Sequence, residues 1–160
     1  MMPIPACQGD WQGLARVAAT IRDDRARRDP ELVAAGKMPP ATADRRIRIA
    51  SALAELWQTI AARAALPDVE TRAIETRFAE GAAHSEIRAD LKETIVRARA
   101  ALDKDPGSRR KRAMLDGVEA LLWQHQPYDG CDGEPRILFI AELNAQLRHR
   151  ERATCQTKAA

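Results

Sequence analysis

The chain has 160 residues, of which 45% are hydrophobic, 31% are charged and 4% are aromatic. This length fits one compact domain over residues 1–160. Its 26 basic and 23 acidic side chains leave a net charge of +3, which is too mild to indicate a dedicated nucleic-acid coat. Three scattered cysteines without a Cys-x-x-Cys pair indicate a reduced, cytoplasmic setting. No stretch approaches the roughly 20 apolar residues that span a bilayer, so we expect no membrane contact.

The first predicted helix begins after Asp10, a residue type that caps helix N-termini well. Its apolar residues recur at helical spacing on one face: Trp11, Leu14, Val17, Ala18 and Ile21. The run at residues 22–29 carries charges of both signs and is expected to face solvent. Asp29, Pro30 and Gly36 then predict one or two separate helical turns, with Asp29 as the cap and Gly36 at the end.

A second helix is expected over residues 40–64, with an apolar stripe close to a heptad pattern: Ile47, Ala50, Leu53, Ala54, Trp57 and Ile60. Each of these two helices has one apolar stripe, and neither is expected to be stable alone. The short connection between them therefore predicts an antiparallel helical hairpin.

The third and fourth predicted helices follow in the middle of the chain. The third runs from Pro67 to Gly81, and the fourth begins at Ser85. Their inward-facing residues are Val69, Ala73, Ile74 and Phe78 in the third helix, and Ile87, Leu91, Ile95, Ala98 and Leu102 in the fourth. Residues 103–108 form a turn cluster and a possible sub-domain boundary.

Two further helices complete the predicted fold. The fifth ends before Pro127, and the sixth begins near Pro135. Their inward-facing residues are Met114, Leu115, Val118, Leu121 and Leu122 in the fifth helix, and Ile137, Ile140, Leu143 and Leu147 in the sixth. Residues 136–140 would also suit a strand, but no second strand is expected to pair with them. The tail at residues 153–160 is expected to be frayed.

These elements together predict an all-α fold of about six helices, in which the N-terminal hairpin packs on a second helical group. The tryptophans lie on or beside apolar stripes and are expected in the core: Trp11, Trp57 and Trp123.

Residues 29–60 resemble short uncharacterised proteins encoded by phages and prophages of alphaproteobacteria. The matching positions are Pro30, Val33, Gly36, Lys37, Met38, Ala43, Asp44 and Ile47. Asp29 stands where these proteins carry Tyr, and Pro39 stands where they carry a capping hydroxyl. The resemblance implies a helical hairpin and a phage or prophage origin, and it implies no catalytic mechanism.

Residues 66–102 are similar to the DNA-binding region four of sigma factors. The shared positions are Leu66, Pro67, Arg72, Arg77, Phe78, Glu80, Gly81, Glu86, Ile87, Leu91 and the run 97–102. The turn and the first half of the recognition helix, which contact DNA in that family, are missing here because Leu91 leads almost directly to Arg97. The apolar period from Ile87 to Leu102 is unbroken, so we expect one continuous helix in place of a helix-turn-helix.

Residue types that carry catalysis or bind metals are sparse. The histidines are far apart in the sequence, and His84 and His149 are expected at the surface. One loop contains residues that could surround a metal ion: His125, Asp129, Cys131, Asp132 and Glu134. Their spacing fits neither an EF-hand nor a zinc site, and the Asp-Gly pairs favour an ordinary turn. Cys131 as a nucleophile would need a positioned base. We therefore expect no catalytic residue, metal or cofactor.

Two basic clusters are the best candidates for contact with a partner or with phosphate. The first opens the fifth helix, where cations oppose the helix dipole: Arg109, Arg110, Lys111 and Arg112. The second ends the sixth helix, where cations suit the dipole: Arg148, Arg150 and Arg152. The first cluster is the stronger candidate, with a solvated helix start beside a loop as the alternative. No aromatic residues are interleaved with either cluster, which argues against single-strand binding.

These observations favour a phage- or prophage-encoded accessory protein that acts by binding and has no active site. The expected partner is a host or defence protein or nucleoprotein, inhibited by occlusion through charge-complementary docking. The alternative is a small DNA-binding regulator that uses the basic clusters and a degraded helix-turn-helix. The heptad-like stripes could pack within one chain or across a dimer, which leaves the oligomeric state open.

Overall fold

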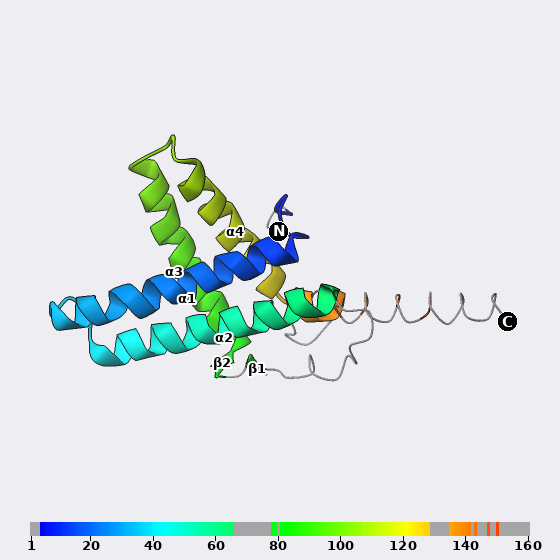
Figure 1. The fold of residues 1–160 in the computed structure, drawn as a ribbon, viewed down its shortest axis with the longest axis horizontal. Helices are drawn as coiled ribbons and strands as arrows, with labels where there is room; N and C mark the ends of the chain where they lie inside the picture. The colour runs from blue at the N-terminus through cyan, green and yellow to red at the C-terminus, as the bar shows by residue number, and fades with distance from the viewer. Residues whose placement is uncertain are drawn as a thin grey trace.

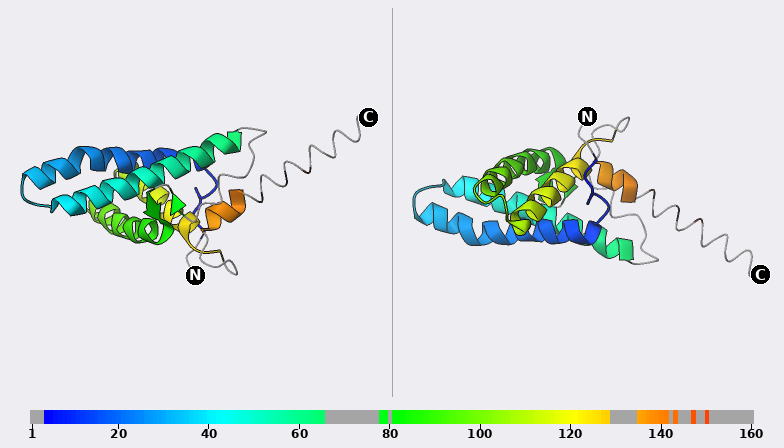
Figure 2. Two further views of the ribbon diagram at one scale, coloured as in Figure 1. Left: turned by 90° about the horizontal axis from the view of Figure 1, so that it is seen from below. Right: turned by 90° about the horizontal axis from the view of Figure 1, so that it is seen from above.

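The computed structural model describes residues 4–65, 78–79, 81–128, 135–141, 143, 147 and 150. Four long helices form two antiparallel hairpins, α1 (Trp11–Ala34) with α2 (Pro40–Ala65) and α3 (His84–Asp103) with α4 (Arg109–His125). The two hairpins lie in separate layers that cross each other (Figure 1 and Figure 2). Residues 136–141 are also helical. The predicted all-α fold, with an N-terminal hairpin on a second helical group, is confirmed.

Helix α1 is longer than the sequence predicts, because it continues through Pro30 to Ala34. The carboxylate of Asp10 accepts a hydrogen bond from the Gly13 amide at 2.8 Å, which confirms the predicted N-cap. The separate helical turns expected at residues 29–36 are wrong. Pro30 removes one backbone hydrogen bond, but the carbonyl it frees belongs to Ala26, which is exposed and open to water. The helix therefore continues at a modest cost.

The turn between α1 and α2 depends on Gly36. Its φ of 67° lies in the left-handed region that glycine adopts without strain. The Lys37 amide donates to the Leu32 carbonyl at 2.8 Å, and the Gly36 amide donates to the Val33 carbonyl at 3.0 Å. This is the Schellman pattern, and it satisfies carbonyls that the end of α1 leaves open. The chain then reverses into α2 at Pro40.

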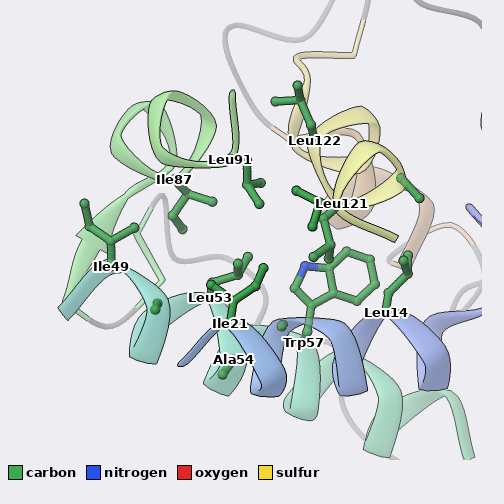
Figure 3. Packing of buried hydrophobic residues seen from close by; sticks show 14 of the residues in the cluster. Leu14, Ile21, Ile49, Leu53, Ala54, Trp57, Ile87, Leu91, Leu121 and Leu122 are labelled. Atoms are coloured by element: carbon green, nitrogen blue, oxygen red, sulfur yellow. The ribbon is translucent and has the colours of Figure 1, made fainter. Parts of the chain in front are cut away.

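The core lies between the two layers, with α1 and α2 on one side and α3 and α4 on the other (Figure 3). Trp57 of α2 is fully buried, as predicted, and Leu14 and Ile21 of α1 lie beside it. The opposite hairpin contributes Ile87, Leu91 and Leu121, whose side chains point toward α1 and α2, and Leu122 is buried in the same cluster. The other two tryptophans, Trp11 and Trp123, are only half-buried. Packing between the hairpins thus stabilises helices that would not persist alone.

Helix α4 approaches α1 closely at Gly117. A methyl group added at Gly117 would lie 2.6 Å from Cγ2 of Val17, closer than two carbon atoms can pack. Gly117 is buried within a helix, a position where glycine is otherwise unfavourable. Its lack of a side chain sets the distance between the two layers.

A short two-stranded sheet precedes α3. Strand β1 (Phe78–Ala79) pairs antiparallel with strand β2 (Ala82–Ala83), and Gly81 turns between them with a φ of 93°. The predicted helix from Pro67 to Gly81 is therefore wrong at residues 78, 79 and 81, and its residues 67–77 and 80 lie outside the described part of the chain. Helix α3 begins at His84, one residue before the predicted Ser85.

Residues 135–141 lie beside the end of α4, where the Arg136 amide donates to the Gln126 carbonyl at 2.9 Å. The predicted helix after Pro135 is confirmed over residues 136–141, where Ile137 is fully buried. Leu143 and Leu147 were expected to face inward but are 43% and 46% exposed. Residues 104–108 connect α3 to α4, and a sub-domain boundary there stays a prediction. None of the described helices combines the length and apolar content needed to cross a membrane.

Candidate functional site

The first predicted basic cluster lies at the tip of the α3–α4 hairpin, which projects beyond the α1–α2 layer (Figure 1). Ser108 caps α4, because its hydroxyl accepts a hydrogen bond from the Lys111 amide at 3.3 Å. Arg109, Arg110 and Arg112 are exposed within the first turn that follows. The structure thus presents three guanidinium groups together at one end of the molecule. We call Arg109, Arg110, Lys111 and Arg112 the basic tip.

The charges of the basic tip are only partly neutralised. Lys111 forms an ion pair with Asp105, with 3.1 Å between Nζ and Oδ2. The ion pairs of the described residues include none for Arg109, Arg110 or Arg112. The first turn of α4 also has no acidic residue, although acidic residues are favoured there. The tip is therefore suited to an anionic ligand.

The second basic cluster is described only at Arg150, which is exposed. Arg148 and Arg152 lie outside the described residues, as do Asp129, Cys131, Asp132, Glu134 and His149. The remaining member of the suggested metal loop, His125, is buried at the end of α4. Within the described ranges, no three His, Cys, Asp or Glu side chains gather as metal ligands do.

A buried cluster of His84, His125 and Trp57 lies where α2, α3 and α4 meet. The indole Nε1 of Trp57 donates a hydrogen bond to Nε2 of His125 at 3.0 Å, and the two imidazole rings are 6.0 Å apart. Burial lowers the pKa of His125 to about 3, and the nearby His84 and Arg88 act in the same direction. His125 is therefore neutral at ordinary pH and serves as an acceptor in the core.

The sequence-based placement of these histidines is corrected. His84 was expected at the surface but is only 6% exposed, and it lies close to His125 although the two are far apart in the sequence. Helical spacing could have revealed both positions. His84 continues the stripe of Ile87 and Leu91, and His125 continues that of Val118 and Leu121.

A second polar cluster ties α1 to α2 and α3. The guanidinium of Arg25 donates to both carboxylate oxygens of Asp90 at 2.9 and 2.7 Å, and also to Thr94 and to the Arg46 carbonyl. Asp29 accepts from Nε of Arg46 at 2.9 Å. Arg25 and Asp29 belong to the run expected to face solvent, but they are 4% and 1% exposed. They continue the inward stripe of Ala18 and Ile21 at helical spacing, so this expectation was wrong.

Arg48 of α2 holds the start of α3 in place. Its guanidinium donates to the Gly81 carbonyl and to both carboxylate oxygens of Glu86. The hydrogen bonds that Glu86 accepts from Arg48 and from the Ala83 amide lower its pKa to about 2. The contact fixes the short sheet and the first turn of α3 on α2.

The α3–α4 hairpin also carries an open apolar groove of about 440 Å³ beside the N-terminal segment. Ile95 and Leu122 form its floor, and Val96 and Ile4 stand at its edges. The N-terminal segment is held on α4 by Gln124, whose Nε2 donates to the Gln8 carbonyl at 2.7 Å. The sequence stripes did not indicate this groove, because Val96 lies off the buried face.

Helix α3 tests the expectation of one continuous helix between Ile87 and Leu102. The helix runs without interruption from His84 to Asp103, so the predicted continuous helix is confirmed. A helix-turn-helix needs a turn between its two helices, and the residues from Glu86 to Leu102 contain none. No protein-family model, curated protein or solved structure matches this chain.

Proposed function

We propose that this chain is a phage- or prophage-encoded accessory protein that acts in the cytoplasm by binding, without an active site. The target is a host or defence nucleoprotein, which the chain inhibits by occluding a functional surface. The observation that carries the proposal is the basic tip, where Arg109, Arg110 and Arg112 are exposed at the end of a projecting hairpin without an ion pair among the described residues.

The basic tip gathers its exposed cations in one helical turn, whereas several charges on α1 are paired with their neighbours. On α1, Arg22 pairs with Asp23 and Arg27 pairs with Asp24, so these charges largely cancel. At the tip, cations occupy the helix end where each opposes the dipole by about 0.3–1 kcal/mol. The tip cations thus lower the stability of the fold slightly. Such a cost is expected at exposed residues that are kept because they bind a partner. Charge complementarity would then set the orientation and the association rate with an acidic partner face.

Affinity capture from a host lysate, with nuclease treatment, tests this proposal. We expect the wild-type chain to retain a protein partner, and the variant Arg109→Glu/Arg110→Glu/Arg112→Glu to lose it. Acidic residues are favoured in the first turn of a helix, so this variant should fold at least as stably as the wild type. The matched control is Arg16→Glu/Arg28→Glu/Lys37→Glu, which changes the same charge on exposed residues of the other hairpin. Equal retention by both variants would contradict the proposal.

A DNA-binding regulator is the second candidate, and the exposed arginines of the tip favour it because guanidinium groups also suit phosphates. The continuous helix α3 argues against a helix-turn-helix mode. Fluorescence anisotropy with labelled duplex DNA across a salt series separates the two candidates. A steep loss of affinity with salt that disappears in the tip variant would favour DNA. A shallow response would favour a protein partner.

A further inference from the structure

The apolar groove on the α3–α4 hairpin exposes large hydrophobic side chains that the fold does not use. Val96 is 69% exposed and Ile4 is 71% exposed, while the floor residues Ile95 and Leu122 are buried. Val96 sits in the interior of α3, where valine is a poorer helix former than alanine or leucine. Neither core packing nor helix propensity accounts for this residue, and it is well placed to contact a partner.

The charges of the α3–α4 hairpin indicate which charge that partner would carry. On this hairpin, the ion pairs already engage five carboxylates: Glu86, Asp90, Glu93, Asp105 and Glu119. The cations that form no ion pair among the described residues are Arg88, Lys92, Lys104, Arg109, Arg110 and Arg112, against the carboxylates of Asp103 and Asp116. Lys92 lines the groove itself. The unpaired charge left on this hairpin is therefore mainly basic, and Lys92 places one of these cations at the apolar groove.

The dimensions of the groove favour a helix as the occupant. Its α3 wall is formed by Lys92, Val96 and Arg99, which span about 10 Å along the helix axis, or two turns. The residues that line the groove belong to α3, α4 and the N-terminal segment. The groove therefore offers no strand edge to which an extended peptide could add. A helix satisfies its own backbone hydrogen bonds and can fill such a groove with side chains alone.

We infer that the partner docks an amphipathic helix into this groove, with an apolar ridge against Val96 and Ile4 and carboxylates toward Lys92 and the basic tip. This inference rests on the proposed function and names the chemistry of the partner. Nucleic acid fits the cations but has no apolar side chains to bury against Val96 and Ile4. A protein helix can pair its carboxylates with the cations and can also bury apolar area. The burial alone contributes roughly 25 cal/mol per Å² of apolar surface.

Three synthetic peptides of about 18 residues, or five helical turns, test the inference. The first has leucines spaced three and four apart with flanking glutamates, the second has lysines in place of the glutamates, and the third has serines in place of the leucines. Fluorescence anisotropy measures the affinity of each for the full chain. We expect the acidic leucine peptide to bind at least about tenfold more tightly than either of the others.

The variant Val96→Asp should weaken binding of the acidic leucine peptide by about tenfold or more. It places a charge at an exposed position, so the fold should be retained. The matched control Gln58→Asp, an exposed position on α2, should bind like the wild type. Equal binding of all three peptides, or displacement of the peptide by duplex DNA with no effect of Val96→Asp, would overturn the inference.

The same variants distinguish this inference from the proposed function. If Val96→Asp retains the partner from the lysate while the tip variant loses it, the proposed function stands and the groove inference fails. If Val96→Asp abolishes peptide binding while the tip variant still retains every lysate protein, the groove inference stands and the proposed function fails.

Discussion

Arg25 and Asp90 form an ion pair between the two hairpins, with side chains that are only 5% and 6% exposed. The pair is bidentate, and Thr94 and the Arg46 carbonyl each accept one further hydrogen bond from the two terminal guanidinium nitrogens. A buried pair of this kind contributes little net stability against an apolar pair, but it tolerates only one relative position of its helices. We interpret it as a device that fixes α1 against α3.

Removal of one partner should be strongly destabilising. We expect Asp90→Ala to lower the free energy of unfolding by about 3–5 kcal/mol, because Arg25 is left buried without a counter-charge. The exposed pair of Arg22 and Asp23 provides the control, and Asp23→Ala should cost less than about 1 kcal/mol. Urea unfolding followed by circular dichroism measures both. Similar losses for the two variants would show that the buried position of the pair has no special effect.

His125 should make stability depend on pH. Its pKa in the folded chain, about 3, lies below the ordinary value of 6.5. Below pH 6.5 the unfolded chain binds a proton that the folded chain does not, so the free energy of unfolding falls as pH drops toward 3. The slope from this residue approaches about 1.4 kcal/mol per pH unit.

The variant His125→Gln should reduce this slope, because glutamine keeps an acceptor for Trp57 but does not titrate. Urea unfolding at pH 7 and pH 5 measures the difference, in a range above the ordinary pKa of the carboxyl groups. Identical slopes for wild type and variant would contradict a neutral, buried His125.

At the scale of elements, the sequence predicts regular helices well and their exceptions poorly. The start of α2 and both ends of α4 follow from Pro40, Ser108 and Pro127, because caps and prolines act locally. The continuation of α1 through Pro30 depends on which carbonyl remains exposed, and Phe78 joins a strand through its pairing with Ala83. Both are tertiary effects that local propensity does not contain.

The separation of α1 and α4 should depend on Gly117. Alanine is normally favoured over glycine in a helix by about 1 kcal/mol. We nevertheless expect Gly117→Ala to destabilise the fold by about 1–3 kcal/mol, because the new methyl group would overlap Val17. Thermal unfolding measures the effect.

Two further variants isolate that contact. Gly107 lies in the α3–α4 turn with open space around it, so Gly107→Ala should be nearly neutral. Val17→Ala combined with Gly117→Ala should recover part of the loss, since the smaller side chain makes room for the methyl group. If Gly117→Ala alone is stabilising, α1 and α4 leave room for a methyl group at this position.

For the whole molecule, the candidate binding surface could be predicted only in part. The basic tip could be predicted from the sequence, because four consecutive cations begin a helix. Cations are unfavourable at that end of the helix dipole. The groove does not follow from the sequence, because Ile4 and Val96 are far apart in the chain. Only the fold brings these two residues to the same groove. The structure puts tip and groove on the same hairpin, on residues that take no part in the buried polar clusters.

Amide hydrogen exchange of the chain, alone and bound to the protein it retains from a nuclease-treated lysate, would locate the binding surface. Protection on binding should be concentrated in residues 92–122, on the exposed side of α3 and at the start of α4. Protection confined to α1 and α2, with the α3–α4 hairpin unchanged, would contradict this placement of the binding surface.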